Sequence, residues 1–199
     1  MTVRVVLATH NAHKVEEFQQ ILGASAPELE IVAYDGPEPV EDGVTFADNA
    51  LIKARGACAH TGLPALADDS GICVDVMGGA PGIFSARWAG HHADAVANRR
   101  LLLDQLSDLG EGKRGAHFTA TIALVLPSGE ERVVEGLWPG VVATTESGEY
   151  GFGYDPIFIP AGHDVTAAEL DPAAKNAESH RARAFERLIP AIRTLSNRE

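Results

Sequence analysis

The sequence lacks three features that would each point to a particular class of protein. Its only cysteines, Cys58 and Cys73, are too few for a disulfide framework and do not form a CxxC pair. It has no run of about 18 apolar residues, the length that a membrane-spanning helix needs. The apolar stretch at residues 3–8 is too short for a secretion signal, so we expect a cytoplasmic protein with no membrane partner.

Positive charge is also scarce. The chain has 16 lysine and arginine residues against 28 aspartate and glutamate residues, which gives a formal net charge of −12. Such a charge repels other polyanions, so we expect no nucleic-acid partner. A polyanionic substrate would need a few basic side chains, and a divalent metal ion, to hold it locally against this field.

The composition is otherwise that of a folded globular chain. Hydrophobic residues make up 45% and charged residues 22% of the 199 positions, which excludes a disordered protein. No internal repeat, low-complexity tract or linker-like segment divides the chain. We therefore expect a single domain over residues 1–199.

The apolar pattern predicts alternating strands and helices. Residues 3–8 have the character of a strand buried on both faces, apolar residues recur at helical spacing after Asn11, and residues 29–33 form a second predicted strand. Thr45 followed by Asp48 predicts a helix that starts with a capping box and ends near residue 62. The further predicted strands are 65–67, 72–74, 118–126, 132–137 and 141–144, and the further helices are about 94–106 and 177–195. Because strands and helices alternate while one predicted hairpin is antiparallel, we expect an α/β fold with a mixed sheet.

Polar residues gather at four places next to apolar segments, and the first is Thr9–Lys14. Such a strand-to-helix turn points backbone N–H groups and the helix dipole at one spot. The hydroxyl, amide and ammonium groups of Thr9, Asn11 and Lys14 make it a candidate phosphate site. The alternative is that Asn11 only caps the helix and Lys14 is solvated.

The second place is Ala67–Gly71, which contains Asp68 and Asp69. Neighbouring side chains of an extended segment point to opposite faces, so one of the two carboxylates would face a given site. A hard ion such as Mg²⁺ takes one or two carboxylates plus phosphate oxygens. A second carboxylate could come from Glu38, Glu41 or Asp42. The alternative is a simple Asp-Asp-Ser-Gly turn between two short strands.

The third place is Gly151–Pro156, where Phe152 or Tyr154 could stack on a planar base. The alternative is that these rings belong to the hydrophobic core. The fourth place is Lys175–Arg181, where lysine and arginine donors could bind a carbonyl oxygen or a phosphate. The alternative there is a solvated, charged first turn of the last helix.

Together these segments resemble the inosine triphosphate pyrophosphatases, or HAM1-like proteins, which hydrolyse non-canonical purine nucleoside triphosphates. The resemblance covers nearly the whole chain, and the motifs occur in the family's order. The matching segments are Ala8-Thr9-x-Asn11-x-x-Lys14, Glu41-x-Gly43-x-Thr45-Phe46-x-x-Asn49-Ala50-x-x-Lys53-Ala54, Ala67-Asp68-Asp69-Ser70-Gly71, Gly78-Gly79-Ala80-Pro81-Gly82-x-x-Ser85-Ala86-Arg87, Phe152-Gly153-Tyr154-Asp155-Pro156 and Lys175-x-x-x-Ser179-His180-Arg181.

The resemblance implies an elongated mixed sheet flanked by helices, with two lobes around a central cleft. It also implies a homodimer, a requirement for Mg²⁺ and hydrolysis of dITP, ITP or XTP at the α-phosphorus, which yields a nucleoside monophosphate and pyrophosphate.

The resemblance further implies a role for each matching residue. Asp69 would bind the metal and accept a proton, and Glu41 would be the second metal ligand, with Glu38 as a competing candidate. Phe152 would stack on the base. The implied substrate-binding residues are Thr9, His10, Asn11, Ala12, His13 and Lys14 at the phosphates, Lys53 and Ser70, Phe152, Gly153, Tyr154 and Asp155 in one loop, and Lys175, His180 and Arg181 at the base edge.

Two other functions fit the same residues. The chain could be a purine-nucleotide sensor without catalytic activity, although paired carboxylates beside a phosphate site argue against it. It could also be a nucleotide phosphatase of broader specificity, with pyrimidine or methylated substrates.

Overall fold

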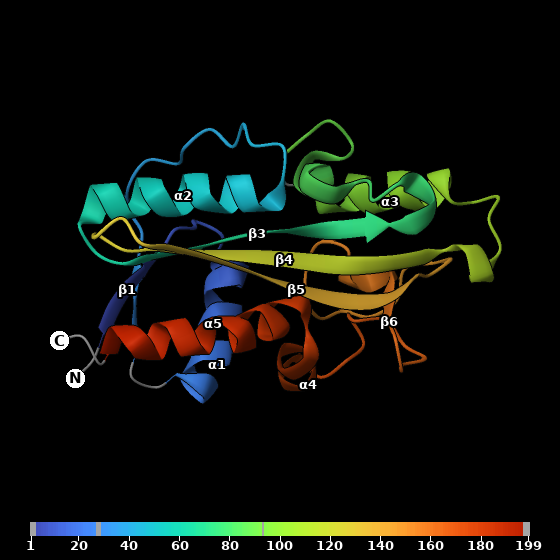
Figure 1. Cartoon of the computed structure of the whole chain (residues 1–199). Coiled ribbons are helices and arrows are strands. Elements are labelled where there is room, and N and C mark those ends of the chain that lie inside the picture. Colours follow the sequence, from blue (N-terminus) through green and yellow to red (C-terminus); the bar gives the residue numbers. More distant parts are fainter. Residues whose placement is uncertain (1–2, 27–28, 93, 197–199) are drawn as a thin grey trace. The chain divides into compact units, whose positions relative to one another are not determined.

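The structure is a computed structural model that describes residues 3–26, 29–92 and 94–196 (Figure 1). Helices and strands alternate along the first half of the chain. The helices are α1 (Ala12–Ser25), α2 (Phe46–Thr61), α3 (Ala95–Gln105), α4 (Pro172–Glu178) and α5 (His180–Ser196). The strands are β1 (Val3–Leu7), β2 (Leu29–Ala33), β3 (Ala65–Val74), β4 (Gly115–Val125), β5 (Glu131–Val142) and β6 (Phe158–Pro160). Short 3₁₀ turns are η1 (Asp75–Met77), η2 (Gly82–Arg87), η3 (Glu111–Lys113) and η4 (Asp155–Ile157).

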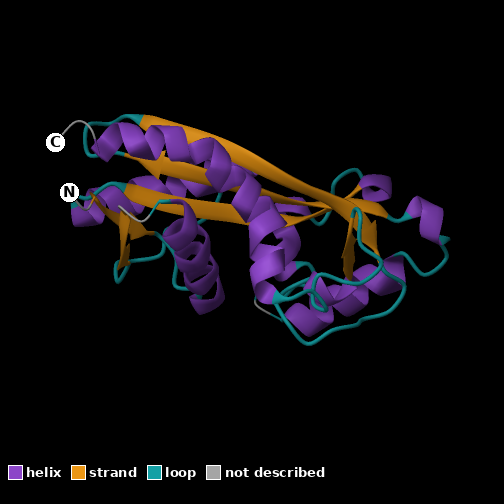
Figure 2. Ribbon diagram, turned by 90° about the horizontal axis from the view of Figure 1, so that it is seen from below, coloured by secondary structure: helices purple, strands orange, loops and turns teal. Residues whose placement is uncertain are grey.

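The strands form one sheet in the order β2-β1-β3-β4-β5-β6. Strand β1 pairs in parallel with both β2 and β3, whereas β5 pairs antiparallel with β6. The longest strands are β3, β4 and β5, with 10, 11 and 12 residues (Figure 2). The expected α/β fold with a mixed sheet and flanking helices is confirmed.

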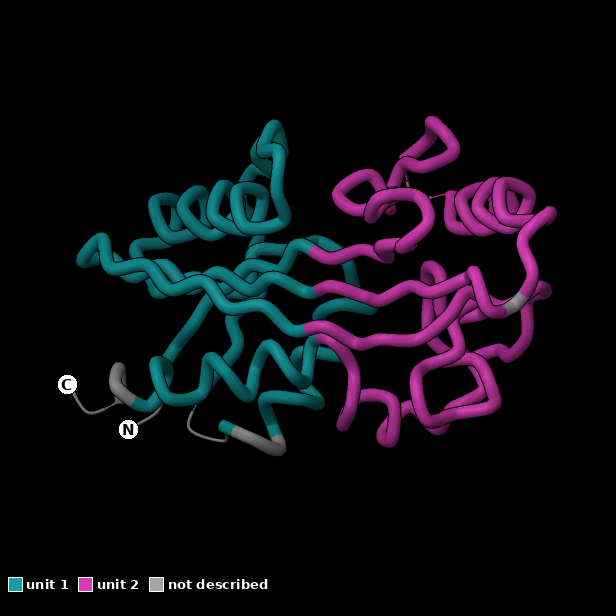
Figure 3. The backbone as a smooth tube through the Cα atoms, turned by 45° about the vertical axis from the view of Figure 1, so that its right-hand side comes forward, with its two compact units in different colours: residues 1–69, 120–136, 181–199 teal, residues 70–119, 137–180 magenta. Residues whose placement is uncertain are grey.

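The chain divides into two compact units, each made of separate stretches of sequence (Figure 3). Unit 1 contains residues 1–69, 120–136 and 181–199, and unit 2 contains residues 70–119 and 137–180. Strands β3, β4 and β5 contribute residues to both units.

Unit 1 has a hydrophobic core on each face of its part of the sheet. On one face Val5 and Leu7 pack against α1 and α5, where the rings of Phe18 and Phe185 meet edge to face at 4.8 Å. On the other face Val6 and the alanines of β3 pack against α2. This packing on two faces is why β1 is apolar on both faces from Val5 to Leu7, whereas Arg4, near its start, is exposed.

Unit 2 has an aromatic core of its own. The ring of Phe118 lies 4.6 Å from that of Phe158 and 6.4 Å from that of Trp138. Leu102 of α3 and Leu106, which follows the helix as its C-cap, pack into the same cluster. This core supports α3 and the loop that precedes β6.

Most predicted elements are present, and three predictions are wrong. The segments 65–67 and 72–74 are one strand, β3, because residues 68–71 are extended rather than turned. Gly71 is needed for close packing instead, since a Cβ there would overlap Gly82 O and Ser85 Oγ. The predicted strand 141–144 is the end of β5, which stops at Val142.

The last helix is also divided differently from the prediction. Lys175 lies in the separate helix α4, and Ser179, whose backbone is extended, separates α4 from α5. Asp171 caps α4 and Pro172 occupies its first turn, so the sequence did contain a start signal for this helix.

No helix within residues 3–26, 29–92 or 94–196 is both long and apolar enough to cross a membrane.

Candidate active site

The turn between β1 and α1 is held by its own polar side chains. Asn11 caps α1, and its Oδ1 accepts from the backbone N–H of Lys14 over 3.3 Å. Thr9 Oγ1 accepts from the backbone N–H of Asn11 over 3.2 Å. The side chains of residues 10–13 are exposed along this turn, and Lys14 begins the ion pairs described next. Asn11 therefore does cap the helix, but Lys14 is not simply solvated.

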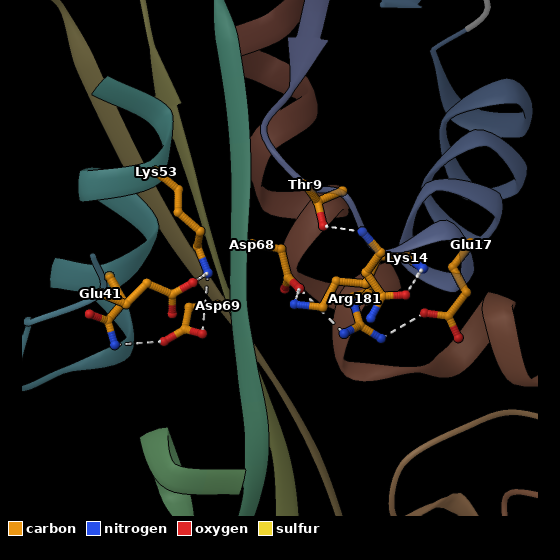
Figure 4. Close-up of polar contacts among 10 residues, drawn as sticks. Thr9, Lys14, Glu17, Glu41, Lys53, Asp68, Asp69 and Arg181 are labelled. Atoms are coloured by element: carbon orange, nitrogen blue, oxygen red, sulfur yellow. Dashed lines mark hydrogen bonds and ion pairs between the residues drawn. The ribbon is translucent and has the colours of Figure 1, made fainter. Parts of the chain in front are cut away.

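Asp68 faces α1 and α5 from the middle of β3 (Figure 4). Its Oδ2 lies 2.8 Å from Lys14 Nζ and 3.3 Å from an Arg181 guanidinium nitrogen. The other terminal nitrogen of Arg181 lies 2.6 Å from Glu17 Oε2. Burial opposes ionisation of Asp68, but Lys14 and Arg181 outweigh it and hold the pKa of this carboxyl well below its usual range. Asp68 is therefore a fixed negative charge that positions Lys14 and Arg181.

Asp69 faces the opposite side of β3, toward α2 (Figure 4). Its Oδ1 lies 3.4 Å from Lys53 Nζ, and its Oδ2 accepts from Asn49 Nδ2 over 3.2 Å. Lys53 Nζ also lies 3.1 Å from Glu41 Oε1. As expected for an extended segment, the two neighbouring aspartates serve different faces. Asp69 and Glu41 thus converge on one cationic nitrogen.

The pKa of Asp69 is shifted in the opposite direction to that of Asp68. Burial raises the pKa of Asp69, and the nearby carboxylates of Glu41 and Asp68 raise it further. The attraction of the Lys53 ammonium lowers this pKa, but by less than burial and the carboxylates raise it. For Lys53, burial lowers the pKa, but the carboxylates around it raise it by more, so the side chain stays an ammonium. A buried carboxylate with a raised pKa is a candidate proton acceptor.

The structure distinguishes Glu38 from Glu41, two of the three candidate sources of a second carboxylate beside Asp69. Glu38 lies in the acidic loop of residues 35–43 and pairs with His10 Nδ1 at 2.9 Å. Glu41, in the same loop, points to Lys53 and not to His10. Two carboxylates around one cation suit a hard metal ion that also takes substrate oxygens. No cluster of three or more histidine, cysteine or acidic side chains that could hold a metal occurs in the described part of the chain.

In unit 2, Asp155 organises the glycine-rich loop of residues 148–155. Its Oδ2 accepts from the backbone N–H of Phe152 over 2.8 Å and lies 2.7 Å from Lys175 Nζ. Lys175 Nζ lies 5.4 Å from the centre of the Phe152 ring. This places a half-buried aromatic ring beside a buried cation, which suits a planar, electron-rich ligand.

The other aromatic residue of this loop is part of the core. Tyr154 is buried, and its hydroxyl donates to Ser85 O over 2.8 Å. Burial raises the pKa of Tyr154, so this hydroxyl remains protonated. The alternative considered in the sequence analysis, that these rings belong to the hydrophobic core, describes the surroundings of Tyr154.

The basic residues near the last helix are not a solvated first turn. Lys175, His180 and Arg181 are each only 3% exposed. The His180 ring stacks on Phe118, with centres 4.9 Å apart and an interplanar angle of 14°. Arg181 instead joins Asp68 and Glu17 in unit 1, while Lys175 and His180 belong to unit 2.

The predicted site residues therefore form two groups, one in each unit. Ser70 follows Asp69 directly in β3 and is the first residue of unit 2. The unit 1 group is Thr9, His10, Asn11, Ala12, His13, Lys14, Glu41, Lys53, Asp69 and Arg181, and the unit 2 group is Ser70, Phe152, Gly153, Tyr154, Asp155, Lys175 and His180.

The sequence model of the Ham1 family matches residues 5–191 of this chain. The chain belongs to the Ham1 family. A relative from Leifsonia xyli subsp. xyli, named dITP/XTP pyrophosphatase, is 71% identical over 194 residues, which is 98% of each chain. The family resemblance expected from the motifs is thus confirmed.

Solved structures of Ham1 proteins have the same fold. A nucleoside-triphosphatase / dITP/XTP pyrophosphatase from Mycobacterium abscessus is 48% identical with a TM-score of 0.76, over 96% of this chain and 100% of that one. A HAM1 protein from Coxiella burnetii is 40% identical with a TM-score of 0.86, over 97% of this chain and 100% of that one.

Sequence reasoning missed two residues that hold the unit 1 group of this Ham1 protein. Glu17 is the second carboxylate partner of Arg181. Asn49 is buried, accepts from the backbone N–H of Gly43 over 3.0 Å and donates to Asp69. Asn49 is one of the residues of the matching family segments. Its position in the first turn of a helix that follows the acidic loop was the signal that could have identified it as a site residue. Glu17 lies one turn after Lys14, which puts both on one face of α1.

Proposed function

We propose that this Ham1 protein is a nucleoside triphosphate pyrophosphatase. It hydrolyses non-canonical purine nucleoside triphosphates (dITP, ITP and XTP) to the monophosphate and pyrophosphate, and so removes them from the nucleotide pool. Family membership and the names of close relatives support this. The single observation that carries the chemistry is the buried Asp69, whose carboxylate faces Lys53 together with Glu41.

Lys14 and the β1–α1 turn bind the phosphates in this proposal. The exposed turn ends at the N-terminus of α1, where backbone N–H groups and the helix dipole favour an anion. Asp68 holds the Lys14 ammonium in place over 2.8 Å. The Lys14 ammonium and the helix dipole attract the triphosphate locally, against the overall charge of −12.

Asp69 and Glu41 would hold Mg²⁺. When bound, the ion supplies polarisation of the phosphoryl group and neutralises charge that develops on the leaving pyrophosphate. Mg²⁺ prefers oxygen ligands such as carboxylates. The contacts of Lys53 Nζ with both Asp69 and Glu41 support the idea that these two carboxylates can face one cation. Lys53 then contributes a second positive charge beside the phosphates.

Asp69 acts as the proton acceptor. Water attacks the α-phosphorus as its proton passes to Asp69, the bond from the α-phosphorus to the bridging oxygen breaks, and pyrophosphate leaves with the bonding electrons. Without a bound metal ion, burial raises the pKa of Asp69, so the protein surroundings by themselves favour proton uptake by this carboxylate. Donation from Asn49 Nδ2 fixes the orientation of this carboxylate. No covalent enzyme intermediate is required.

The base is bound by stacking and read by cations. Phe152 stacks on the purine, and Lys175, His180 and Arg181 donate to its edge. Hypoxanthine and xanthine present a 6-oxo acceptor to these donors, whereas adenine presents a 6-amino donor, which places two donors face to face. The burial of all three residues supports a strong penalty for that mismatch.

The proposal also includes a homodimer in the cytoplasm, acting on nucleotides and not on nucleic acids or membranes. The resemblance to the family supports the dimer, and the strongly negative net charge argues against nucleic acid. Light scattering on the purified protein would test the dimer.

Product identification tests the activity directly. The protein is incubated with Mg²⁺ and dITP, ITP, XTP, ATP or GTP, and pyrophosphate and orthophosphate are measured separately. We expect pyrophosphate and the monophosphate from dITP, ITP and XTP, with ATP consumed far more slowly. Release of orthophosphate would instead indicate a phosphatase, and binding without turnover would indicate a sensor.

A further inference from the structure

The glycine-rich loop has an anchor that neither the motifs nor the proposed chemistry includes. Arg99 lies in α3, and its side chain is 13% exposed. One terminal nitrogen donates to Gly153 O over 2.8 Å, and the other donates to Glu146 Oε2 over 3.1 Å. The planar guanidinium thus holds one point within the loop and one just before it, and its fixed fork sets their relative orientation better than a flexible ammonium would.

This loop needs an anchor because its backbone is unusually free. Gly148, Gly151 and Gly153 have φ angles of 88°, 75° and 63°, a region that favours glycine. Glycine loses more conformational freedom on folding than any other residue. Fixing the loop in one conformation therefore depends on specific contacts rather than on backbone preference.

The other contacts divide the loop into two halves. The backbone N–H groups of Glu149 and Tyr150 both donate to Ala168 O, at 3.1 and 3.0 Å, which fixes the first half. In the second half, Asp155 accepts from the Phe152 N–H and pairs with Lys175 of α4. Arg99 ties the second half to a second helix, α3, and it does so at the carbonyl of Gly153, the residue that follows Phe152.

We propose that Arg99 is a positioning residue that sets the pose of the Phe152 ring for stacking on a purine base. The inference rests on the proposed function, since it assumes that Phe152 binds the base. Arg99 itself touches no substrate. It acts through the Gly153 peptide, and Glu146 supplies the counter-charge that keeps its guanidinium in this orientation.

A positioning role at the base predicts a particular kinetic pattern. Stacking on the base is equal in the ground state and the transition state, so its loss raises KM and leaves kcat nearly unchanged. Purines stack alike whatever their 6-substituent, so the preference for ITP over ATP should be retained. Binding of pyrophosphate, which has no base, should also be unaffected.

The test compares Arg99→Gln and Arg99→Lys with Arg100→Gln, an exposed arginine of the same helix as the control. Steady-state kcat and KM are measured with ITP, together with product inhibition by pyrophosphate and the melting temperature. We expect Arg99→Gln to raise KM about tenfold or more, with kcat within about threefold and pyrophosphate inhibition unchanged. Arg99→Lys should be intermediate, and the control should match the wild type.

Two results would overturn the proposal. One is a KM within about twofold of the wild type in Arg99→Gln, and the other is a parallel loss of kcat and pyrophosphate inhibition, which would show a general structural role. Should Arg99→Gln fail to fold, Glu146→Gln provides the same test, with an expected rise in KM of about threefold and an unchanged KM as the contrary result. A wild-type protein that does not hydrolyse ITP would refute the proposed function. A wild-type protein that hydrolyses ITP, together with an Arg99→Gln variant of unchanged KM, would refute only the role of Arg99.

Discussion

Asn49 donates a hydrogen bond from its side-chain nitrogen to Asp69 Oδ2 over 3.2 Å. The same amide accepts the backbone N–H of Gly43 through its oxygen, at the end of the acidic loop that carries Glu41. One buried side chain therefore joins the segments that bear the two candidate metal ligands. A Cβ at Gly43 would overlap Asn49 Oδ1, so the close approach requires glycine.

Asn49→Ala should lower kcat by about tenfold to a hundredfold, because Asp69 loses the donor that orients it. Asn98→Ala is the matched control, since Asn98 is equally buried and accepts the backbone N–H of Ala89 over 2.7 Å. Both variants should melt at a lower temperature, but only Asn49→Ala should lose turnover. Equal turnover in the two variants would show that Asn49 only anchors the acidic loop and does not orient Asp69 for the reaction.

Asp69→Asn should bind ITP within about tenfold of the wild type while turnover falls about a hundredfold or more, because the proton acceptor is gone. Binding is measured by calorimetry and turnover by pyrophosphate release. Near-normal turnover would remove Asp69 from the reaction.

Removal of Mg²⁺ by a chelator should abolish turnover, and Glu41 should matter more than Glu38. Glu41→Gln should raise the Mg²⁺ concentration for half-maximal activity by about tenfold, because one of two carboxylate ligands is lost. Glu38→Gln is the control, since Glu38 pairs with His10 instead. A stronger effect of Glu38→Gln would exchange the two assignments.

Asp68 and Asp69 should affect stability in opposite directions. In the folded state the pKa of Asp68 is lowered, so its ionised form stabilises the protein above the ordinary aspartate pKa of about 4. Asp68→Asn should therefore unfold at lower urea concentration than the wild type at pH 7, and this difference should shrink as the pH falls below about 4.

For Asp69 the sign is reversed. Burial raises its pKa, so the ionised carboxylate destabilises the folded state once the pH exceeds the raised value. Asp69→Asn should resist urea better than the wild type at pH 7, and this advantage should vanish below about pH 4. Both series are measured with a chelator present, and the same sign for the two variants would contradict the assigned surroundings.

Arg181→Ala should lower kcat/KM more for ITP than for ATP, by about tenfold or more, because a donor to the 6-oxo group is lost. Arg193→Ala, an exposed arginine of the same helix, is the control. An unchanged ratio with both substrates impaired would limit Arg181 to its contacts with Asp68 and Glu17.

Local signals in the sequence were enough for much of the fold. The capping box of Thr45 and Asp48 and the cap at Asn11 are both present. Each involves residues at most three positions apart, so short-range chemistry determines them. Strand β2 spans the predicted residues 29–33, because a parallel strand needs only a short apolar run.

The same local reasoning failed at residues 68–71. An Asp-Asp-Ser-Gly run is typical of a turn, yet these residues continue a strand. The partners that make the extended form stable, Lys14, Lys53 and Arg181, come from three helices far apart in the sequence. Burial of two adjacent carboxylates is possible only where such partners are in place.

The sequence by itself determined that two aspartates are neighbours, and neighbouring side chains of an extended chain point to opposite faces. Only the tertiary structure decided which cationic side chain contacts the aspartate on each face. α1 and α5 bring Lys14 and Arg181 to one side, and α2 brings Lys53 to the other. The opposite pKa shifts of two neighbouring aspartates follow from that packing, because a shift depends on the charges and the burial around a carboxyl and not on the identity of the residue.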